Sequence, residues 1–334
     1  MKKSSSTKRW ERRHPACRGS QGPRRFNRAT EIIVGFLILL GVHFNSNAQT
    51  RRSSATATGS PSLTITTEPN AAIWLDEVRR GVTDASGKFA LTKISSGRHV
   101  LRVRANGFKE TSLPLLPARR GAINVKLLRT TDEAELLFQQ AEEARDKAKD
   151  DEARKEAAEL YRRALKVRSA FPSARVGLAR VLMDLNDYRN ALAEIEAARR
   201  TRPIYPEASA VEGRINREAA DTDEAIKSFR RAITEAHGFQ PEAHVGLARI
   251  FEDRGQYEAA APEYEVAIKQ LSDTEPVIYQ LLGAAYEKLE KYKEAVGAYE
   301  KYLQLAPNGS LAPAVRSIID QVRREAAGQE LKPD

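Results

Sequence analysis

The sequence predicts an α+β protein with two folded regions, a small antiparallel β-sandwich followed by an all-α solenoid of helix-turn-helix repeats. The first observation is a set of short alternating or β-branched runs within residues 62–128, interrupted by turn residues. The second is a spacing of 34 or 35 residues between prolines that each open an amphipathic stretch, namely Pro172, Pro206, Pro241 and Pro276. A chain of 334 residues is long enough for two or three packing units.

Residues 1–48 have the pattern of an export signal. A strongly basic segment occupies residues 1–31, and the apolar run of residues 32–44 follows it. Ser46 and Ala48 supply the small residues that a cut after residue 48 requires. An uncleaved signal anchor, held in the membrane by residues 32–44, is the alternative. Both forms predict an exported protein of the periplasm or cell envelope.

The placement of charge along the chain argues against a nucleic-acid partner. The net charge of the whole chain is +10, but ten basic and two acidic residues fall within residues 1–48, so that the exported part is nearly neutral. The basic residues of 62–128 are not interleaved with stacking aromatics, as single-strand binding would require. Cys17, the one cysteine, lies before the predicted cut, which excludes a thiolate nucleophile or disulfide from the exported form.

A flexible linker over residues 49–61, rich in Ser, Thr and Ala, precedes the β region. Five strands are expected, at residues 63–66, 72–75, 88–91, 99–105 and 122–127. Within residues 99–105, Leu101 and Val103 alternate with arginines, so we expect these two apolar side chains in the core and Arg102 and Arg104 on an outward face. That basic face is either a contact for anionic lipid or acidic wall polymer, or an ordinary solvated surface.

Two stretches of the β region carry a family resemblance. LTITTEPNAAIWLDEVRRG and SSGRHVLRVRANGFKE resemble the PEGA-type bacterial sandwich, although its tetrapeptide appears only as Glu68-Pro69-Asn70-Ala71. A carboxypeptidase-regulatory-like sandwich is the alternative, because VTDASGKFAL resembles a strand and turn of that family. Both resemblances imply a noncatalytic surface module.

The helical half resembles tetratricopeptide repeats. LLGAAYEKLEKYKEAVGAYEKYLQLAP carries small, aromatic and proline residues at the offsets of that family, namely Leu282, Gly283, Tyr286, Tyr292, Ala295, Tyr299 and Pro307. The resemblance implies a degenerate repeat at 130–171, repeats at 172–205, 206–239, 241–274 and 276–309, a capping helix at 310–328 and a tail at 329–334. Glu212 and Asn216 stand where an apolar and an aromatic residue are usual, so we expect loose packing of the helix that carries them.

No catalytic, cofactor or metal-binding pattern is present in the sequence, and we expect no enzyme activity. His99, His237 and His244 belong to no metal-ligand spacing or catalytic triad motif. In the repeat family, the ninth position of each first helix points into a concave groove. Arg180, Arg214 and Arg249 occupy it here, with Arg217 one turn further on. These arginines can bind carboxylates of an extended, acidic peptide, unless neighbouring Glu and Asp residues neutralise them.

The sequence therefore predicts a noncatalytic exported scaffold that binds a protein or peptide partner in this groove and contacts the envelope through the PEGA-like module. One alternative is a structural envelope component that binds wall polymer or membrane and self-associates. Another is an accessory subunit of an envelope enzyme.

Overall fold

The computed structural model describes residues 63–330, with gaps at 77, 93, 95–98 and 117–120. The predicted export signal, the linker at 49–61 and the end of the tail lie outside the described residues. Among the helices that are described, none combines the length and the apolar character needed to cross a membrane.

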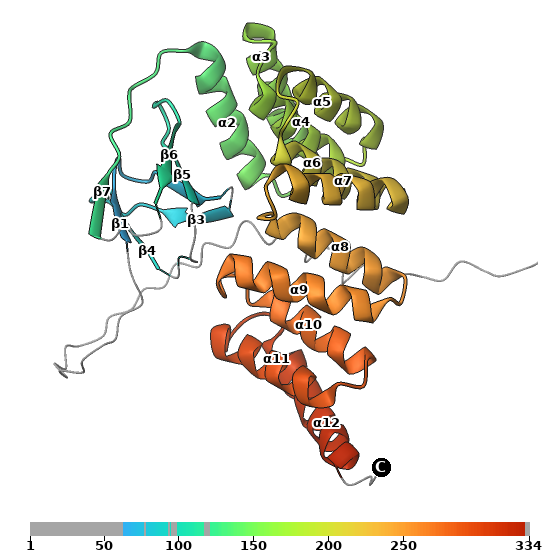
Figure 1. Cartoon of the computed structure of the whole chain (residues 1–334). Helices are drawn as coiled ribbons and strands as arrows, with labels where there is room; N and C mark the ends of the chain where they lie inside the picture. Colours follow the sequence, from blue (N-terminus) through green and yellow to red (C-terminus); the bar gives the residue numbers. More distant parts are fainter. Residues whose placement is uncertain (1–62, 77, 93, 95–98, 117–120, 331–334) are drawn as a thin grey trace, which may run out of the picture. The chain divides into compact units, whose positions relative to one another are not determined.

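The β region consists of two small sheets (Figure 1). One has the order β4-β1-β7, built from β1 (Leu63–Thr66), β4 (Lys88–Leu91) and β7 (Gly121–Asn124). The other has the order β3-β2-β5-β6, built from β2 (Ala72–Leu75), β3 (Val78–Val82), β5 (His99–Arg104) and β6 (Thr111–Leu115). Buried side chains from both sheets form one hydrophobic cluster. Leu101 and Val103 belong to it, as their alternation predicts.

The prediction of a purely antiparallel β region was wrong for one pair of strands, because β1 and β7 run parallel. They are the first and last strands of the region, so that everything between them supplies the long connection that parallel neighbours need. Two strands, β3 and β6, were missed. VRRGV has adjacent arginines in place of apolar alternation, and TSLPL contains Pro114. Because β6 is an edge strand, this proline has no ladder hydrogen bond to lose on its outer side.

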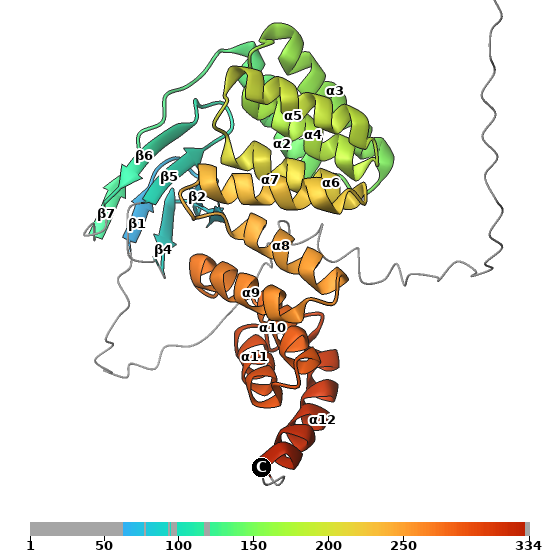
Figure 2. The ribbon, with the colours of Figure 1, turned by 45° about the vertical axis from the view of Figure 1, so that its right-hand side comes forward.

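The helical half is a succession of antiparallel pairs followed by a final helix, visible in both orientations (Figures 1 and 2). The pairs are α2 (Glu133–Lys147) with α3 (Asp151–Val167), α4 (Pro172–Asp184) with α5 (Tyr188–Thr201), α6 (Pro206–Glu218) with α7 (Thr222–Glu235), α8 (Pro241–Asp253) with α9 (Tyr257–Leu271), and α10 (Val277–Lys288) with α11 (Tyr292–Leu305). The final helix is α12 (Ala312–Glu330). Three of the periodic prolines are the first residues of their helices, where proline costs no hydrogen bond, and Pro276 directly precedes α10.

Aromatic side chains of the second helices join consecutive pairs. The ring of Phe229 in α7 is fully buried and lies against Gly213 of α6 and Gly246 of α8. A Cβ at Gly213 would come within 2.5 Å of this ring, so glycine is required for the close approach. The ring of Tyr161 in α3 likewise lies against Gly177 of α4, in the next hairpin. Each ring therefore packs between neighbouring hairpins, as expected of stacked repeats.

The loose packing expected around Glu212 and Asn216 is not observed. Glu212 forms an ion pair with Arg231 of α7. The Asn216 side-chain amide donates a hydrogen bond to the hydroxyl of Ser228, also in α7, at 3.4 Å. Asn216 is only 7% exposed. Polar partners on α7 thus compensate for the missing apolar and aromatic residues of α6.

Candidate interaction surface on the first helices

The first helix of each pair presents one position that repeats through the array, and we call these positions together the first-helix face. Each of them directly follows a small residue that packs against the second helix. The residues are Glu142, Arg180, Arg214, Arg249 and Ala284. The structure places the three predicted arginines on consecutive first helices, α4, α6 and α8. Glu142 does not stand out in the sequence, because the α2–α3 pair departs from the repeat spacing.

Two of the arginines pair with the next hairpin. Arg180 of α4 lies 2.7 Å from a carboxylate oxygen of Glu207, the second residue of α6. Arg214 of α6 lies 3.2 Å from Glu242, the second residue of α8. The same ion pair is therefore used twice, from the ninth position of one first helix to the second position of the next.

Arg249 breaks this pattern because the corresponding position of the next hairpin is Val277. Its guanidinium instead lies 3.3 Å from Glu252, one turn along the same helix. Glu252 also accepts a 2.6 Å hydrogen bond from the Tyr264 hydroxyl. Arg217, the fourth predicted residue, pairs with adjacent Glu218 at 2.6 Å. Each of the four predicted arginines thus has a carboxylate within its own array.

Charge on this face is strongly stabilised. Burial by itself would lower the pKa of Arg180, but the carboxylates of Glu207 and Glu242 outweigh burial and raise that pKa. Burial by itself would raise the pKa of Glu207, but the guanidinium groups of Arg180 and Arg102 hold it at about 2. Both members of this pair are therefore ionised at neutral pH.

The β region meets the first-helix face at Glu142. Arg104 of β5 is 8% exposed and lies 3.0 Å from Glu142 of α2 and 2.7 Å from Glu110. The prediction of an accessible arginine face, either solvated or in contact with lipid or wall polymer, was therefore wrong for Arg104. The missed signal is Trp74, which faces Arg102 in register on neighbouring β2 and carries both guanidinium groups near its ring.

Glu142 accepts several of these contacts at once. Besides Arg104, it receives Arg145 at 3.1 Å and a hydrogen bond from the Tyr161 hydroxyl. Burial would raise the pKa of Glu142, but Arg145 and Arg104 outweigh burial and hold it at about 2. Glu142 thus links the first hairpin to the β region.

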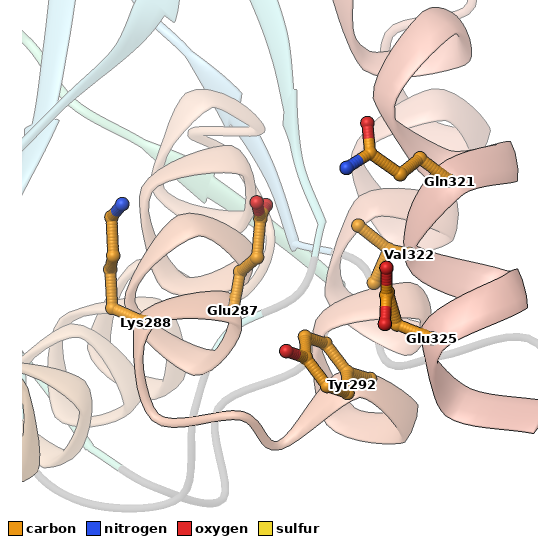
Figure 3. Close-up of a pocket in the computed structure, with 6 residues that line it drawn as sticks. All are labelled: Glu287, Lys288, Tyr292, Gln321, Val322 and Glu325. Atoms are coloured by element: carbon orange, nitrogen blue, oxygen red, sulfur yellow. The ribbon is translucent and has the colours of Figure 1, made fainter. Parts of the chain in front are cut away.

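Two histidines of the described ranges form separate ion pairs. His99 pairs with Asp76 and His244 with Glu263, each a single carboxylate, and no group of metal-ligating side chains occurs among these residues. A pocket of about 270 Å³ lies beside α12, lined by Glu287, Lys288, Tyr292, Gln321, Val322 and Glu325 (Figure 3).

Comparisons with known proteins agree with this architecture. Tetratricopeptide repeat families match residues 148–209, 176–241 and 211–276, and then 276–308. No curated protein matches the chain. No enzyme family is indicated, and the repeat is typical of protein–protein interaction scaffolds.

Several solved structures share this helical arrangement. PilW, described as a widely conserved type IV pilus biogenesis factor, aligns at 14% identity and a TM-score of 0.51, covering 59% of this chain and 89% of that one. The pilF protein of Pseudomonas aeruginosa aligns at 15% identity and a TM-score of 0.50, covering 59% and 88%. A chain of the APC/C hetero-tetramer Cut9-Hcn1 aligns at 16% identity and a TM-score of 0.49, over 58% of this chain and 37% of that one. These identities establish similarity of fold alone, and residues 148–308 are tetratricopeptide repeats.

Proposed function

We propose that this protein is a noncatalytic scaffold whose first-helix face holds a protein partner. The observation that carries the proposal is the repeated charged position on consecutive first helices of a tetratricopeptide array. Such repeats bind extended or helical segments by shape and charge complementarity. Specificity then comes from the residue type at this position, which differs from one first helix to the next. It is Glu142 in the first hairpin, an arginine in the next three, and Ala284 in the last.

The partner contacts the array at α8 and α10. Arg180 and Arg214 already join neighbouring hairpins, whereas Arg249 pairs with Glu252 of its own helix. Burial raises the pKa of Glu252, with Arg249 and the Tyr264 hydroxyl opposing, so that this carboxylate is costly to keep ionised. A carboxylate from an acidic, extended partner segment can take its place and form a bidentate pair with the guanidinium.

Export and envelope contact complete the proposal. The basic segment and apolar run of residues 1–48 support a secretory signal, and the PEGA resemblance supports a β-sandwich surface module at 62–128. Lys88, Lys109 and Lys126 of the β region are exposed, and they are the groups that would meet anionic lipid or wall polymer.

Crosslinked affinity capture in the native cell tests the partner site. The full chain is compared with Arg249→Glu and with the control Arg189→Glu, which makes the same charge change at an exposed position of α5. We expect Arg249→Glu to lose a partner that the parent and the control both retain, with unchanged helicity by circular dichroism. Equal capture by all three proteins would sink the proposed site.

Cell fractionation with N-terminal sequencing tests the location. The proposal predicts an envelope or periplasmic fraction, with a mature chain that begins at Gln49 if the signal is cleaved. Recovery of the chain in the cytoplasm with Met1 retained would refute export.

A further inference from the structure

The surface around Glu142 of α2 and Glu207 of α6, which adjoins the first-helix face, already has an occupant, strand β5 of the same chain. Arg102 and Arg104 are two residues apart, so their side chains leave the strand on the same side. Arg104 lies 3.0 Å from Glu142 of α2 and 2.7 Å from Glu110. Arg102 lies beside it, 4.0 Å from the same Glu110, and its positive charge contributes to the lowered pKa of Glu207 of α6. The Trp74 ring lies 4.8 and 5.1 Å from the two guanidinium carbons and holds them as a pair.

Polar contacts between the β region and the helices continue beyond β5. We call these contacts together the β–helix seam, which consists of the pairs Arg79–Asp146, Arg104–Glu142, Gln139–Gly107 and Arg80–Leu271. Arg79 lies 3.1 Å from Asp146 of α2. The Gln139 side chain accepts from the Gly107 amide at 2.8 Å and donates to the Phe108 carbonyl at 2.7 Å. At the other end, Arg80 donates to the Leu271 carbonyl of α9 at 3.1 Å.

The seam joins two cores that are otherwise separate. The hydrophobic cluster of the β region contains only residues between Leu63 and Leu127, and the helical clusters begin at Ala134. Among the described residues, three side-chain contacts of other kinds cross between the two regions. Val78 packs against a helical cluster, the Arg104 guanidinium lies 4.7 Å from the Phe138 ring, and the His99 and Phe239 rings meet edge-on at 6.5 Å. An interface held by charges and hydrogen bonds in place of a common core allows its two sides to separate without unfolding.

Each of the two helix carboxylates also pairs with an arginine of the helical half. Glu142 already has Arg145, and Glu207 already has Arg180, each from a first helix. A carboxylate has about four acceptor sites, so each of them can take a second arginine from an incoming strand. The face formed by α2 and α6 is therefore a receptor for paired arginines even after β5 leaves.

We infer that this face binds extended segments that carry an Arg-x-Arg pair, and that β5 is its resident ligand, which an external segment of the same chemistry must displace. The inference rests on the proposed function for the role of the first-helix face. It assigns to α2 and α6 a partner chemistry opposite to the acidic segment proposed for α8. The β region thereby limits access to part of the array.

The first experiment measures whether the seam depends on the two arginines. Spin labels are placed on Lys88→Cys in β4 and Gln304→Cys in α11, both exposed, in a full chain with Cys17→Ser, and the distance distribution is recorded by pulsed electron resonance. We expect one narrow distribution in this parent and a broad one after Arg102→Glu with Arg104→Glu. The control Lys109→Glu with Lys126→Glu makes the same charge change at exposed positions and should remain narrow.

A narrow, unchanged distribution in the arginine variant overturns the inference. If that variant does not fold, Arg102→Gln with Arg104→Gln removes both charges and retains long polar side chains, and the same broadening is expected of it.

The second experiment measures binding in trans. The probe is a fluorescent peptide with the sequence HVLRVRA of residues 99–105, compared with the same peptide carrying glutamine in place of both arginines. If β5 occupies the face at least nine-tenths of the time, the variant with Arg102→Glu and Arg104→Glu, in which the face is free, should bind the arginine peptide at least about tenfold more tightly than the parent. Equal binding by the two proteins, or equal binding of the two peptides, overturns the inference.

Arg249→Glu separates this inference from the proposed function. Arg249 lies outside the seam, so this variant should keep the narrow distance distribution and the peptide affinity of the parent. Loss of partner capture by Arg249→Glu therefore reports on the α8 site alone, and broadening reports on the seam alone.

Discussion

Replacing Glu142 with glutamine should destabilise the protein strongly, and the loss should depend on pH. The Glu142 side chain is 20% exposed and its pKa is held at about 2, against 4.5 for the free side chain. A carboxyl whose pKa is depressed on folding contributes stability above its unfolded pKa and loses that contribution as pH falls towards its folded pKa. The difference in pKa corresponds to about 3 kcal/mol at neutral pH.

Glutamine retains the size of the side chain but leaves Arg104 and Arg145 without this counter-charge. The free energy of unfolding, from urea titrations followed by circular dichroism, should therefore fall by about 3 kcal/mol at about pH 7. At about pH 3 the parent has itself lost part of the contribution, and the difference should shrink to about 1.5 kcal/mol.

The control is Glu143→Gln, one residue along α2. The Glu143 side chain is 47% exposed, forms a surface ion pair with Lys147 and accepts one exposed hydrogen bond from Asn106 at 3.3 Å, so its loss should cost less than about 1 kcal/mol. A Glu142→Gln loss that is equal at both pH values would refute the reasoning, because it would show that packing rather than charge carries the effect.

Two further changes test other parts of the structure. Phe229→Ala removes the ring that separates Gly213 from Gly246 and should lower the free energy of unfolding by about 3–5 kcal/mol. The control Ile318→Ala, at a site 37% exposed, should lower it by about 1 kcal/mol or less. Similar losses for the two variants would contradict the packing role of the Phe229 ring. Burial raises the pKa of Glu275 to about 7, with Arg80 opposing, against 4.5 in the unfolded chain. Above that unfolded pKa, the cost of ionising Glu275 destabilises the folded state, so Glu275→Gln should stabilise the protein increasingly as pH rises. The gain in thermal midpoint should be absent near about pH 4 and present near about pH 8, and a gain of equal size at both would be evidence against that shift.

The helical array was readable from sequence because its signals are local and repeated. Proline at the first position of α4, α6 and α8 and glycine beneath an aromatic ring are conditions that each hairpin must satisfy for itself. The register of Arg180, Arg214 and Arg249 follows directly from the period.

The partners of these arginines were not readable in the same way. The sequence placed candidate carboxylates near each arginine along its own helix, which is correct for Glu252 and Glu218. The acid that pairs with Arg180 lies in the following hairpin, and its approach depends on how two hairpins stack. Neighbours along the chain are fixed by helix geometry, but neighbours across the stack depend on the packing of every ring between them.

The β region shows the corresponding limit for strands. Alternation correctly identified the buried Leu101 and Val103, but it shows only that Arg102 and Arg104 point away from that core. It does not distinguish water from a second folded region on the outward side. The same rule fails at β3 and β6, whose edge positions tolerate arginine pairs and Pro114 without apolar alternation.

The ion pair that runs from the ninth position of one first helix to the second position of the next makes the array extensible at one place. A second copy of residues 206–240 inserted after residue 240 would offer its own Glu207 to the original Arg214, and its own Arg214 to Glu242. Each arginine at the ninth position of these helices would then still pair with a glutamate of the next hairpin. A second copy of residues 276–309 would add Val277 and Ala284 at these positions, and so would add length without extending the charged series. Duplication within the middle of the gene can therefore lengthen this protein without changing the chemistry of its surface.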